Sequence, residues 1–316
     1  MNANKTKPKV AFMGTPEFAT HSLQALLDSG YPVVAVITKP DKPKGRGLNL
    51  VCSPVKQLAI DHGLNILQPP KITDEVLDVL RKLSVEIIVV SAFGQILKKE
   101  AIALPPFGCI NVHPSLLPKY RGAAPINWTL INGETTTGVT IMRMDTGVDT
   151  GDIIIQREEK IIADEDAGSL QMRLAKNGAQ LLLKALASVI DGEATYKKQD
   201  DSSTTYAPRI VKNDCAIDWN RSAEQIVNFV RGLSPLPTAY TVLDGKVLKI
   251  YSAKAVVTSH SGQIGSIWAM TDEGLPIAVT DGFVYLQEIQ QESKKRMSII
   301  EFIRGHTIRS TRIDGY

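Results

Sequence analysis

The stretch CINVHPSLLPKYRG, Cys109–Gly122, joins a short apolar strand to a loop that prolines and a glycine stiffen. Alternation along a strand places Asn111 and His113 on one face and Ile110 and Val112 on the other. Two large polar side chains on one face of a buried strand cost free energy unless they have partners. In open α/β sheets, ligands bind beyond the carboxyl ends of the strands. The stretch therefore predicts either a hydrogen-bonded pair that braces the next loop or part of a functional site.

On either side of this stretch, short β runs alternate with helical patterns. Near-continuous apolar runs such as Val33–Thr38 and Ile87–Val90 are typical of strands that are buried on both faces. We expect further strands at Lys9–Met13, Ile66–Leu67, Cys109–His113 and Val139–Met144, and helices at Pro16–Asp28, Pro54–His62, Asp74–Leu83 and Gly168–Ile190. The pattern predicts an open, mostly parallel α/β sheet with helices on both faces.

The pattern changes after residue 190. Asp191–Tyr206 is polar and has no clear periodicity, so we expect residues 191–206 to link a first domain, 1–190, to a second, 207–316. Asp244-Gly245 in the second domain fits a tight hairpin turn. There we expect a helix at Ser222–Gly232 and strands at Thr238–Leu243, Val247–Val257, Gln263–Ala269, Pro276–Thr280 and Phe283–Ile289. Short strands separated by turns predict a small OB-like β-barrel.

The composition of the chain argues against several classes of protein. The 316 residues include three cysteines, far apart and without a CxxC pair, so we expect buried or incidental thiols rather than a disulfide frame or a zinc site. No apolar run approaches the ~20 residues of a membrane-spanning helix. The polar, lysine-bearing N-terminus has no signal-peptide region, so we expect a cytoplasmic protein without a membrane partner. The net charge of +3 excludes a strongly basic nucleic-acid coat but allows local basic patches.

The first expected strand ends in Gly14-Thr-Pro-Glu-Phe18, which lacks the G-x-G-x-x-G pattern of dinucleotide-binding sheets. Pro16 and Glu17 are poorly suited to hold a pyrophosphate, and the other glycine-bearing loops carry no Walker pattern. We therefore expect neither a nicotinamide-dependent dehydrogenase nor a nucleoside-triphosphate site.

The loop DTGVDTGD, Asp145–Asp152, is acidic and directly follows an expected strand, so it could bring a carboxylate to the polar pair. Asparagine, histidine and aspartate together suit acyl transfer to an amine. The Asn111 amide can stabilise a developing oxyanion, and His113 can donate to that oxyanion and move protons. Asp149 can orient the imidazole and stabilise its charged form. The alternative for this loop is a metal site, but its aspartates lack the full EF-hand spacing, so we expect no metal.

A family resemblance rests on two segments, Asn111-Val-His113-Pro-Ser-Leu-Leu-Pro-Lys-Tyr-Arg-Gly122 and Gly147-Val-Asp149-Thr-Gly151. Both are similar to the signature of the folate-dependent formyltransferases. The resemblance implies a Rossmann-like catalytic domain, 10-formyltetrahydrofolate as formyl donor, and Asn111, His113 and Asp149 as the catalytic trio. It also implies that the folate binds along three segments. Their residues are Phe93, Gly94, Gln95, Ile96 and Leu97, then Ser115, Leu116, Leu117 and Pro118, then Met144 and Asp145.

Three further features resemble the members of this family that act on methionyl-tRNA. They are Gly14-Thr-Pro-Glu-Phe18, the loop Lys39–Gly47 followed by Ser53-Pro-Val-Lys56, and Arg121-Gly-Ala-Ala-Pro125 together with a second β domain. The match spans nearly the whole chain. It implies transfer of the formyl group to the α-amino group of methionyl-initiator tRNA, for initiation of translation, by a chain that we expect to be monomeric.

Two basic groups are expected to contact the tRNA. The loop Lys39–Gly47 has a local net charge of about +3, which by itself is equally compatible with a solvated surface loop. Its length and the resemblance favour insertion against the tRNA acceptor end, where it would order on RNA. A basic face on a β-barrel suits contact with the RNA backbone. The residues expected at the RNA are Lys39, Lys42, Lys44 and Arg46 in the loop, and Lys294, Lys295 and Arg296 near the C-terminus.

Two other functions fit parts of the sequence. A formyltransferase for a nucleotide-linked amino sugar shares the trio, and Ile126-Asn127-Trp128 resembles some of those enzymes. The basic loop and DTGVDTGD argue against it. A non-catalytic RNA-binding protein with a decayed enzyme domain is disfavoured by the intact trio. A transfer assay that compares charged initiator tRNA, elongator methionyl-tRNA and an amino-sugar nucleotide separates these hypotheses.

Overall fold

The computed structural model describes residues 6–44 and 49–313. The chain divides into two compact units. The first comprises Met1–Ala123, Thr136–Lys160 and Gln171–Ala207, and the second comprises Ala124–Thr135, Ile161–Leu170 and Pro208–Tyr316. Two short segments that precede residue 190 therefore belong to the second unit, whereas the residues just before position 208 belong to the first.

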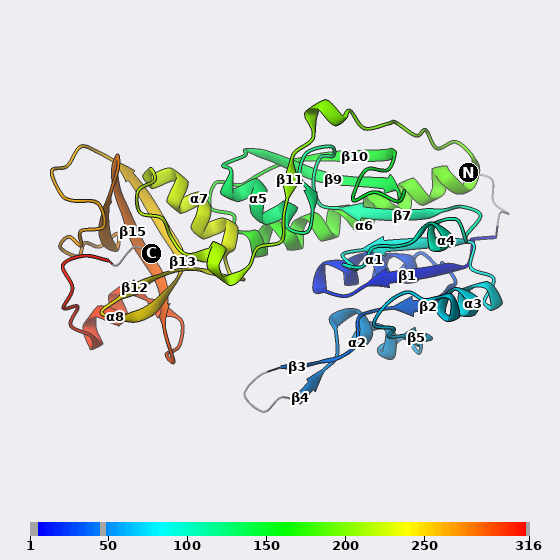
Figure 1. The fold of residues 1–316 in the computed structure, drawn as a ribbon, viewed down its shortest axis with the longest axis horizontal. Coiled ribbons are helices and arrows are strands. Elements are labelled where there is room, and N and C mark those ends of the chain that lie inside the picture. The colour runs from blue at the N-terminus through cyan, green and yellow to red at the C-terminus, as the bar shows by residue number, and fades with distance from the viewer. Residues whose placement is uncertain (1–5, 45–48, 314–316) are drawn as a thin grey trace. The chain divides into compact units, whose positions relative to one another are not determined.

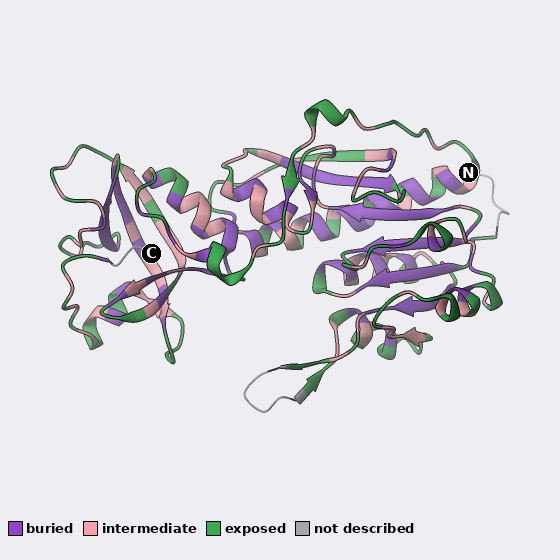
Figure 2. Ribbon diagram, viewed as in Figure 1, coloured by how far each residue is buried: buried purple, intermediate pink, exposed green. Residues whose placement is uncertain are grey.

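Seven strands form the sheet of the first unit, in the order β10-β9-β7-β6-β1-β2-β5 (Figure 1). In this sheet β9 is antiparallel to both of its neighbours, and the other strands run in one direction. The strands are β1 (Val10–Gly14), β2 (Val33–Ile37), β5 (Ile66–Leu67), β6 (Ile87–Ser91), β7 (Cys109–His113), β9 (Thr136–Arg143) and β10 (Ile153–Lys160). The predicted open, mostly parallel sheet is confirmed, and its central strands are buried (Figure 2).

Helices cover both faces of this sheet. On one face, Leu77 packs in a hydrophobic cluster with Met13 and Cys109. On the other face, a helix passes so close to β7 that a Cβ added to Gly178 would lie 3.1 Å from Val112 Cγ1. The helices of this unit are α1 (Glu17–Asp28), α2 (Pro54–Asp61), α3 (Asp74–Lys82), α4 (Lys99–Ile102), most of α6 (Ala167–Asp191) and the 3-10 turn η1 (Asp201–Ser203). Side chains that share the face of Cys109 on β7 therefore point away from α6.

The basic loop lies in a short antiparallel hairpin of β3 (Lys42–Lys44) and β4 (Asn49–Val51). Its apolar residue Leu50 is 71% exposed. At the base of the hairpin, Lys56 of α2 forms an ion pair with Asp41. The hydrogen bond from Lys56 holds the pKa of Asp41 below its usual range. The base of the hairpin is thus anchored to α2, and Leu50 on β4 is exposed.

The segment 191–206, which the sequence predicted to be a linker, is instead bound to the first unit. Lys197 and Ile153 exchange two backbone hydrogen bonds of 2.8 and 2.9 Å. The segment ends in β11 (Tyr206–Ala207), which pairs in parallel with β8 (Arg121–Gly122). Figure 1 shows the segment as the light-green trace that runs from the end of α6 to β11. Its hydrogen bonds go to distant loops, so they leave no periodic signal in the sequence, and we refer to residues 192–207 as the strap.

The second unit is rich in strands, as predicted. Its sheet has the order β12-β13-β15-β14, and β16 pairs with β15. The elements are η2 (Lys212–Cys215), α7 (Ala223–Leu233), β12 (Ala239–Leu243), β13 (Lys246–Val257), β14 (Leu275–Val279), β15 (Gly282–Gln291), β16 (Met297–Ser298) and α8 (Ile299–Gly305). Ile226 and Val230 of α7 pack with Leu248 and Ile250 of β13 in one hydrophobic core.

The turn between β12 and β13 was predicted correctly. Asp244 and Gly245 have φ angles of +52° and +72°, which fit a two-residue hairpin turn. The predicted strand Gln263–Ala269 is wrong, because that segment makes only isolated bridges, from Ser266 and Ile267. Alternation in that segment therefore reflects a partly buried loop rather than a paired strand.

One short helix of the second unit comes from the later part of the first half of the chain. This helix, α5 (Pro125–Ile131), lies against α7. Asn127 Nδ2 donates to the carbonyl oxygen of Gly232 at 2.7 Å, and Trp128 Nε1 donates to that of Pro208 at 2.8 Å. A Cβ on Gly232 would lie 2.7 Å from Ile131 Cγ1 and 3.0 Å from the Ile131 backbone nitrogen. The glycine is therefore what allows the two helices to approach so closely.

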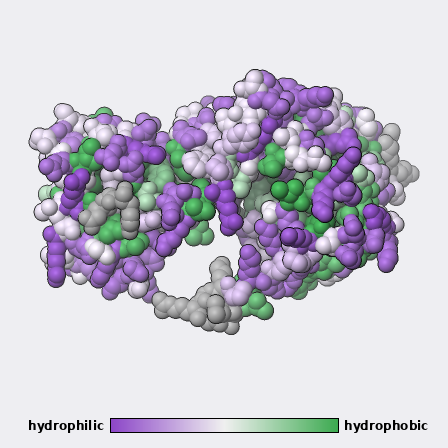
Figure 3. Space-filling model, in the orientation of Figure 1, coloured by the Kyte–Doolittle hydropathy of each residue, from purple (hydrophilic) through white to green (hydrophobic). Residues whose placement is uncertain are grey.

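None of the helices among the described residues could span the hydrocarbon layer of a membrane. The face drawn in Figure 3 mixes hydrophilic and hydrophobic residues over both units. Three free cysteines are present, and Cys109 and Cys215 are buried. Burial raises the pKa of the Cys109 thiol to about 12, so this thiol is neutral at physiological pH.

We predict that Gly232→Val destabilises the second unit. The new side chain must displace the α5 backbone, and such overpacking typically costs about 1–3 kcal/mol of unfolding free energy. The matched control is Gly305→Val at the end of α8, where a Cβ meets nothing within 4 Å. Chemical denaturation followed by circular dichroism measures both variants. Equal stability of the two variants would contradict the close α5–α7 contact.

Candidate active site

Three polar side chains that the sequence singled out meet on one face of the first unit. Asn111 and His113 lie on β7, and their residues are 9% and 4% exposed. Asp149 comes from the loop between β9 and β10. Its Oδ1 lies 3.4 Å from Asn111 Nδ2, and its Oδ2 lies 3.6 Å from His113 Nδ1. An amide, an imidazole and a carboxylate are thus gathered within reach of a single small group.

The route by which Asp149 arrives differs from the expected one. The loop follows a strand, as expected, but in the mostly parallel sheet this strand, β9, is antiparallel to β7, so the loop starts beside the amino end of β7. The Met144 N–H donates to the Cys109 carbonyl at 2.8 Å there, and the Arg143 N–H donates to the Asp152 carbonyl at 2.9 Å. The loop then folds back along the face of β7 until Asp149 reaches His113.

The acidic loop is shaped by its own first aspartate. Asp145 Oδ1 accepts hydrogen bonds from the Gly147 N–H at 3.0 Å and from Thr150 Oγ1 at 2.6 Å. Asp149 has a left-handed backbone with φ of +54°, which is uncommon for a residue other than glycine. Asp145, predicted to bind the folate, therefore has a structural task in the loop.

A backbone N–H completes the surroundings of the Asp149 carboxylate. The Gly122 N–H donates to Asp149 Oδ2 at 2.9 Å. Gly122 has φ of +127°, and a Cβ there would lie 2.6 Å from the Ala207 carbonyl oxygen. Only glycine fits this close approach between β8 and β11. The final glycine of the stretch thus places one hydrogen-bond donor on the carboxylate.

Both ring nitrogens of His113 face oxygen atoms. Nε2 lies 3.0 Å from the Tyr120 carbonyl oxygen, and because a carbonyl only accepts, Nε2 must carry the hydrogen. The 3.6 Å between Nδ1 and Asp149 Oδ2 exceeds the length of a hydrogen bond. Nδ1 is therefore the ring nitrogen that is not bound directly to the protein, and it faces a carboxylate.

Side chains of β9 and β10 fix the loop after β7 by hydrogen bonds to its backbone. Thr140 Oγ1 donates to the Ser115 carbonyl at 2.7 Å and accepts from the Leu117 N–H at 3.1 Å. Ser115 Oγ donates to the Lys119 carbonyl at 2.6 Å, and Leu117 packs with Met142. The side chains of Ser115 and Leu117, both predicted to bind folate, therefore serve the loop itself. Leu116 and Pro118 are half-buried.

The loop after β6 was also predicted to bind folate. Phe93 and Leu97 are buried in the core of the unit, so only their backbone could contact a ligand. Gly94 and Ile96 are exposed, and Gln95 and Met144 are half-buried. Ala92 and Gly94 have φ of +46° and +67°. Two left-handed residues at the end of a buried strand turn the backbone outward, which suits recognition by backbone groups.

Sequence reasoning missed a hydrogen-bond network around the buried Arg121, behind the acidic loop. Arg121 is 4% exposed, and its guanidinium donates to Gln199 Oε1 and to Asp201 Oδ1, both at 2.8 Å. The Tyr120 N–H donates to Thr205 Oγ1 at 2.9 Å. Arg121 was visible in the signature stretch. Gln199, Asp201 and Thr205 were not, because they lie in the strap, whose sequence shows only polarity.

The predicted RNA-binding residues lie in three different settings. Lys42, Lys294 and Lys295 are exposed. The Lys39 side chain instead reaches the loop after β6, where a Cβ on Gly94 would lie 2.7 Å from Lys39 Nζ. Lys44 belongs to β3, and Arg46 lies outside the described residues.

Arg296 has protein partners already. Its Nε donates to Glu288 Oε1 at 2.7 Å, and its guanidinium stacks 4.2 Å from the centre of the Tyr251 ring. The hydrogen bond to Glu288 raises the pKa of Arg296. Of the three C-terminal cations, Arg296 is thus the one whose charge is matched within the protein.

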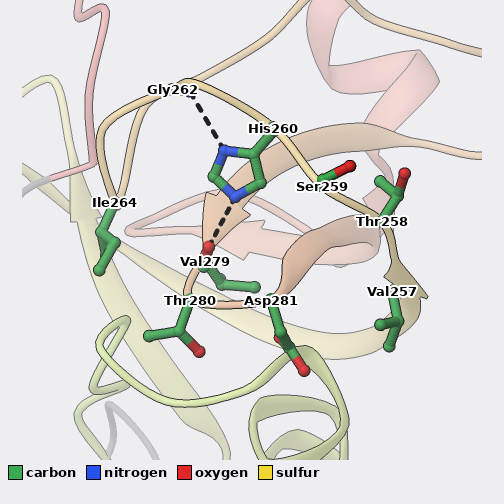
Figure 4. Close-up of a pocket in the computed structure, with 9 residues that line it drawn as sticks. All are labelled: Val257, Thr258, Ser259, His260, Gly262, Ile264, Val279, Thr280 and Asp281. Atoms are coloured by element: carbon green, nitrogen blue, oxygen red, sulfur yellow. Dashed lines mark hydrogen bonds between the residues drawn. The ribbon is translucent and has the colours of Figure 1, made fainter.

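A cavity of about 550 Å³ lies in the second unit, beside the turn between β14 and β15 (Figure 4). It holds none of the predicted catalytic residues. Its histidine, His260, has Nε2 2.7 Å from the Val279 carbonyl oxygen and accepts at Nδ1 from the Gly262 N–H. His260 therefore shapes its loop rather than serving as a base. Within residues 6–44 and 49–313, no cluster of three or more metal-ligating side chains occurs.

Two family models match consecutive parts of the chain. Residues 8–186 match the family described as formyl transferase, and residues 209–307 match the formyl transferase C-terminal domain. A methionyl-tRNA formyltransferase from Syntrophus aciditrophicus is 52% identical over 96% of this chain and 97% of its own length. One from Geobacter sulfurreducens is 48% identical over 94% of this chain and 93% of its own length.

A solved structure shares the fold. It is the N-formyltransferase from Helicobacter canadensis, in complex with folinic acid and dTDP-3-aminofucose. It matches with a TM-score of 0.65 and 22% identity, over 90% of this chain and 99% of that chain. At that identity the likeness concerns the fold alone. On the two family matches and the near full-length relatives, this chain belongs to the formyl transferase family.

Proposed function

We propose that this protein transfers a formyl group from 10-formyltetrahydrofolate to the α-amino group of methionyl-initiator tRNA, for the initiation of translation in the cytoplasm. The observation that carries the chemistry is the convergence of Asn111, His113 and Asp149 at 3.4–3.6 Å. The acceptor is supported by the 52% identity to a methionyl-tRNA formyltransferase over 97% of its length.

The trio suits acyl transfer, because such a reaction builds negative charge on the carbonyl oxygen. Asn111 Nδ2 has two hydrogens, and one of them remains for that oxygen when the other faces Asp149. His113 donates through Nε2 to Tyr120, so Nδ1 is the nitrogen that can donate to the oxygen once it is protonated. Asp149 lies beside Nδ1 and would stabilise the charged ring.

The formyl donor would supply an electrophilic carbonyl carbon, and the chain supplies the groups that hold and polarise it. The exposed backbone at Gly94 and Ile96 and the half-buried residues Gln95, Leu116, Pro118 and Met144 are the groups suited to a folate. Phe93, Leu97 and Leu117 support these segments from the core. The donor would therefore be recognised largely by main-chain groups, as an amide-like pterin edge requires.

Two exposed basic surfaces, one in each unit, suit the binding of an RNA acceptor. The β3–β4 hairpin presents Lys42 and Leu50 beyond an anchored base. In the second unit, Lys294 and Lys295 are exposed, whereas Arg296 is paired with Glu288. Exposed lysines contact phosphates without reading sequence. We propose that the protein acts as a monomer on a single tRNA.

A transfer assay tests the acceptor. Purified protein with 10-formyltetrahydrofolate is expected to formylate methionyl-initiator tRNA, to act at least tenfold more slowly on elongator methionyl-tRNA, and to leave an amino-sugar nucleotide unmodified. Product is measured as the labelled formyl group that passes from the donor to each of the three acceptors. Preferential formylation of the amino-sugar nucleotide would reject the proposed acceptor, and the absence of transfer to any acceptor would reject the enzyme.

We predict that Asn111→Ala and His113→Ala each lower turnover by about 10²–10³, the usual effect of losing one oxyanion donor. Both variants remain folded by circular dichroism, because the removed side-chain groups contact loop residues, Asp149 and Tyr120, and belong to no hydrophobic cluster. The matched controls are Asn213→Ala and His62→Ala, at exposed positions. Turnover within threefold of the parent protein in either site variant would remove that residue from the catalytic trio.

We predict that Lys295→Glu weakens tRNA binding and reduces its dependence on salt, because a cation near phosphate is replaced by an anion. Loss of one phosphate contact lowers the slope of log affinity against log salt by about 1. Lys176→Glu on α6 makes the same change of charge at another exposed position and serves as the control. Identical salt slopes for the two variants would show that Lys295 is not at the RNA.

A further inference from the structure

Gln199 is the one residue between 195 and 203, all of which the structure describes, that is half-buried rather than exposed. Its Nε2 donates to two backbone carbonyl oxygens of the acidic loop, that of Asp149 at 2.8 Å and that of Gly151 at 2.7 Å. The strap thus holds the backbone of the acidic loop at Asp149, which carries the carboxylate, and again two residues later.

The other end of the Gln199 amide is fixed as firmly. Its Oε1 accepts from Arg121 Nε at 3.1 Å and from Arg121 Nη2 at 2.8 Å. Two carbonyls on one side and a guanidinium on the other allow only one orientation of the amide, since a flipped amide would set oxygen against oxygen and N–H against N–H. The amide therefore links a buried cation to the backbone of the acidic loop.

The loop needs such support at this point. Asp149 has φ of +54°, a conformation that L-residues other than glycine persist in only where the surroundings enforce it. Gly151 is also packed tightly, because a Cβ there would lie 1.8 Å from the Arg143 carbonyl oxygen. Holding both carbonyls fixes the peptide planes on either side of the turn, and with them the direction of the Asp149 side chain.

We propose that Gln199 is a positioning residue for the reaction, which sets the Asp149 carboxylate against Asn111 and His113 and is itself held in place by Arg121. This inference rests on the proposed function, because it assigns Gln199 to the same site. Gln199 does not touch the reacting atoms. Its contribution is the placement of a carboxylate, and a misplacement of about 1 Å can lower a catalytic rate about 10²-fold.

The substitution Gln199→Glu isolates this role. A glutamate keeps the oxygen that faces Arg121 and adds a charge that suits it, but it replaces the N–H donor with an oxygen that repels the two carbonyls. The matched control is Gln180→Glu, the same change at an exposed position on α6 of the same unit. Both variants are expected to melt within about 3 °C of the parent protein, since a surface charge or a kept ion pair changes stability little.

Two measurements decide the proposal. In Gln199→Glu, kcat is expected to fall about 10²-fold with KM for both substrates within threefold, and amide hydrogen exchange of the segment 145–152 is expected to rise. Gln180→Glu is expected to change neither. In the background of Asp149→Asn, adding Gln199→Glu is expected to lower kcat less than twofold further, because a residue that acts through Asp149 has nothing left to position.

Unchanged exchange of segment 145–152, unchanged kcat, or losses that multiply in the double variant would each overturn the positioning role. If the parent protein transferred no formyl group, the proposed function would fail by itself. Hydrogen exchange of segment 145–152 would still report whether Gln199 holds the acidic loop, so the two failures are distinguishable.

Discussion

The burial of polar side chains on β7 is the constraint on which the rest of the candidate site depends. Asn111 and His113 leave the strand on the face opposite α6, and the partners they find there come from loops, Asp149 for both side chains and the Tyr120 carbonyl for His113. The Asp149 carboxylate faces both Asn111 and His113. It reaches them because its loop folds back from β9, which is antiparallel to β7. Bringing Asp149 to that position requires the glycine at 122, the left-handed turn at 149 and the network behind the turn.

The central strands and the placement of Asn111 and His113 could be predicted from the sequence, for different physical reasons. Apolar runs gave the central strands because burial on both faces leaves few polar positions, and alternation placed Asn111 and His113 on one face. The approach of Asp149 was harder, because the direction of β9 is set by its pairing and not by its composition. β10 was missed because its exposed half, Gln156 to Glu158, is polar.

Residues that act through tertiary hydrogen bonds were harder still to predict from the sequence pattern. Gln199 lies among exposed polar neighbours. Its two hydrogen bonds to the acidic loop follow neither the helix nor the strand periodicity of the sequence. Arg296, just before β16, pairs with Glu288 of β15, so the prediction of three free cations at 294–296 overstated the basic surface of the second unit. Charge along a sequence therefore sets an upper bound on a basic surface, and the partners that folding supplies decide how much of it remains.

The place of α5 has a consequence for the order in which the molecule can be assembled. Ile131 of α5 packs against the core that contains Ile226 and Val230 of α7, yet about 90 residues separate the end of α5 from the start of α7. At translation rates of roughly 5–20 residues per second, a ribosome exposes α5 on the order of 5–20 s before its partner helix emerges. During that interval the growing chain carries a hydrophobic segment whose partner helix has not yet emerged. Chaperones at the exit tunnel could bind this segment.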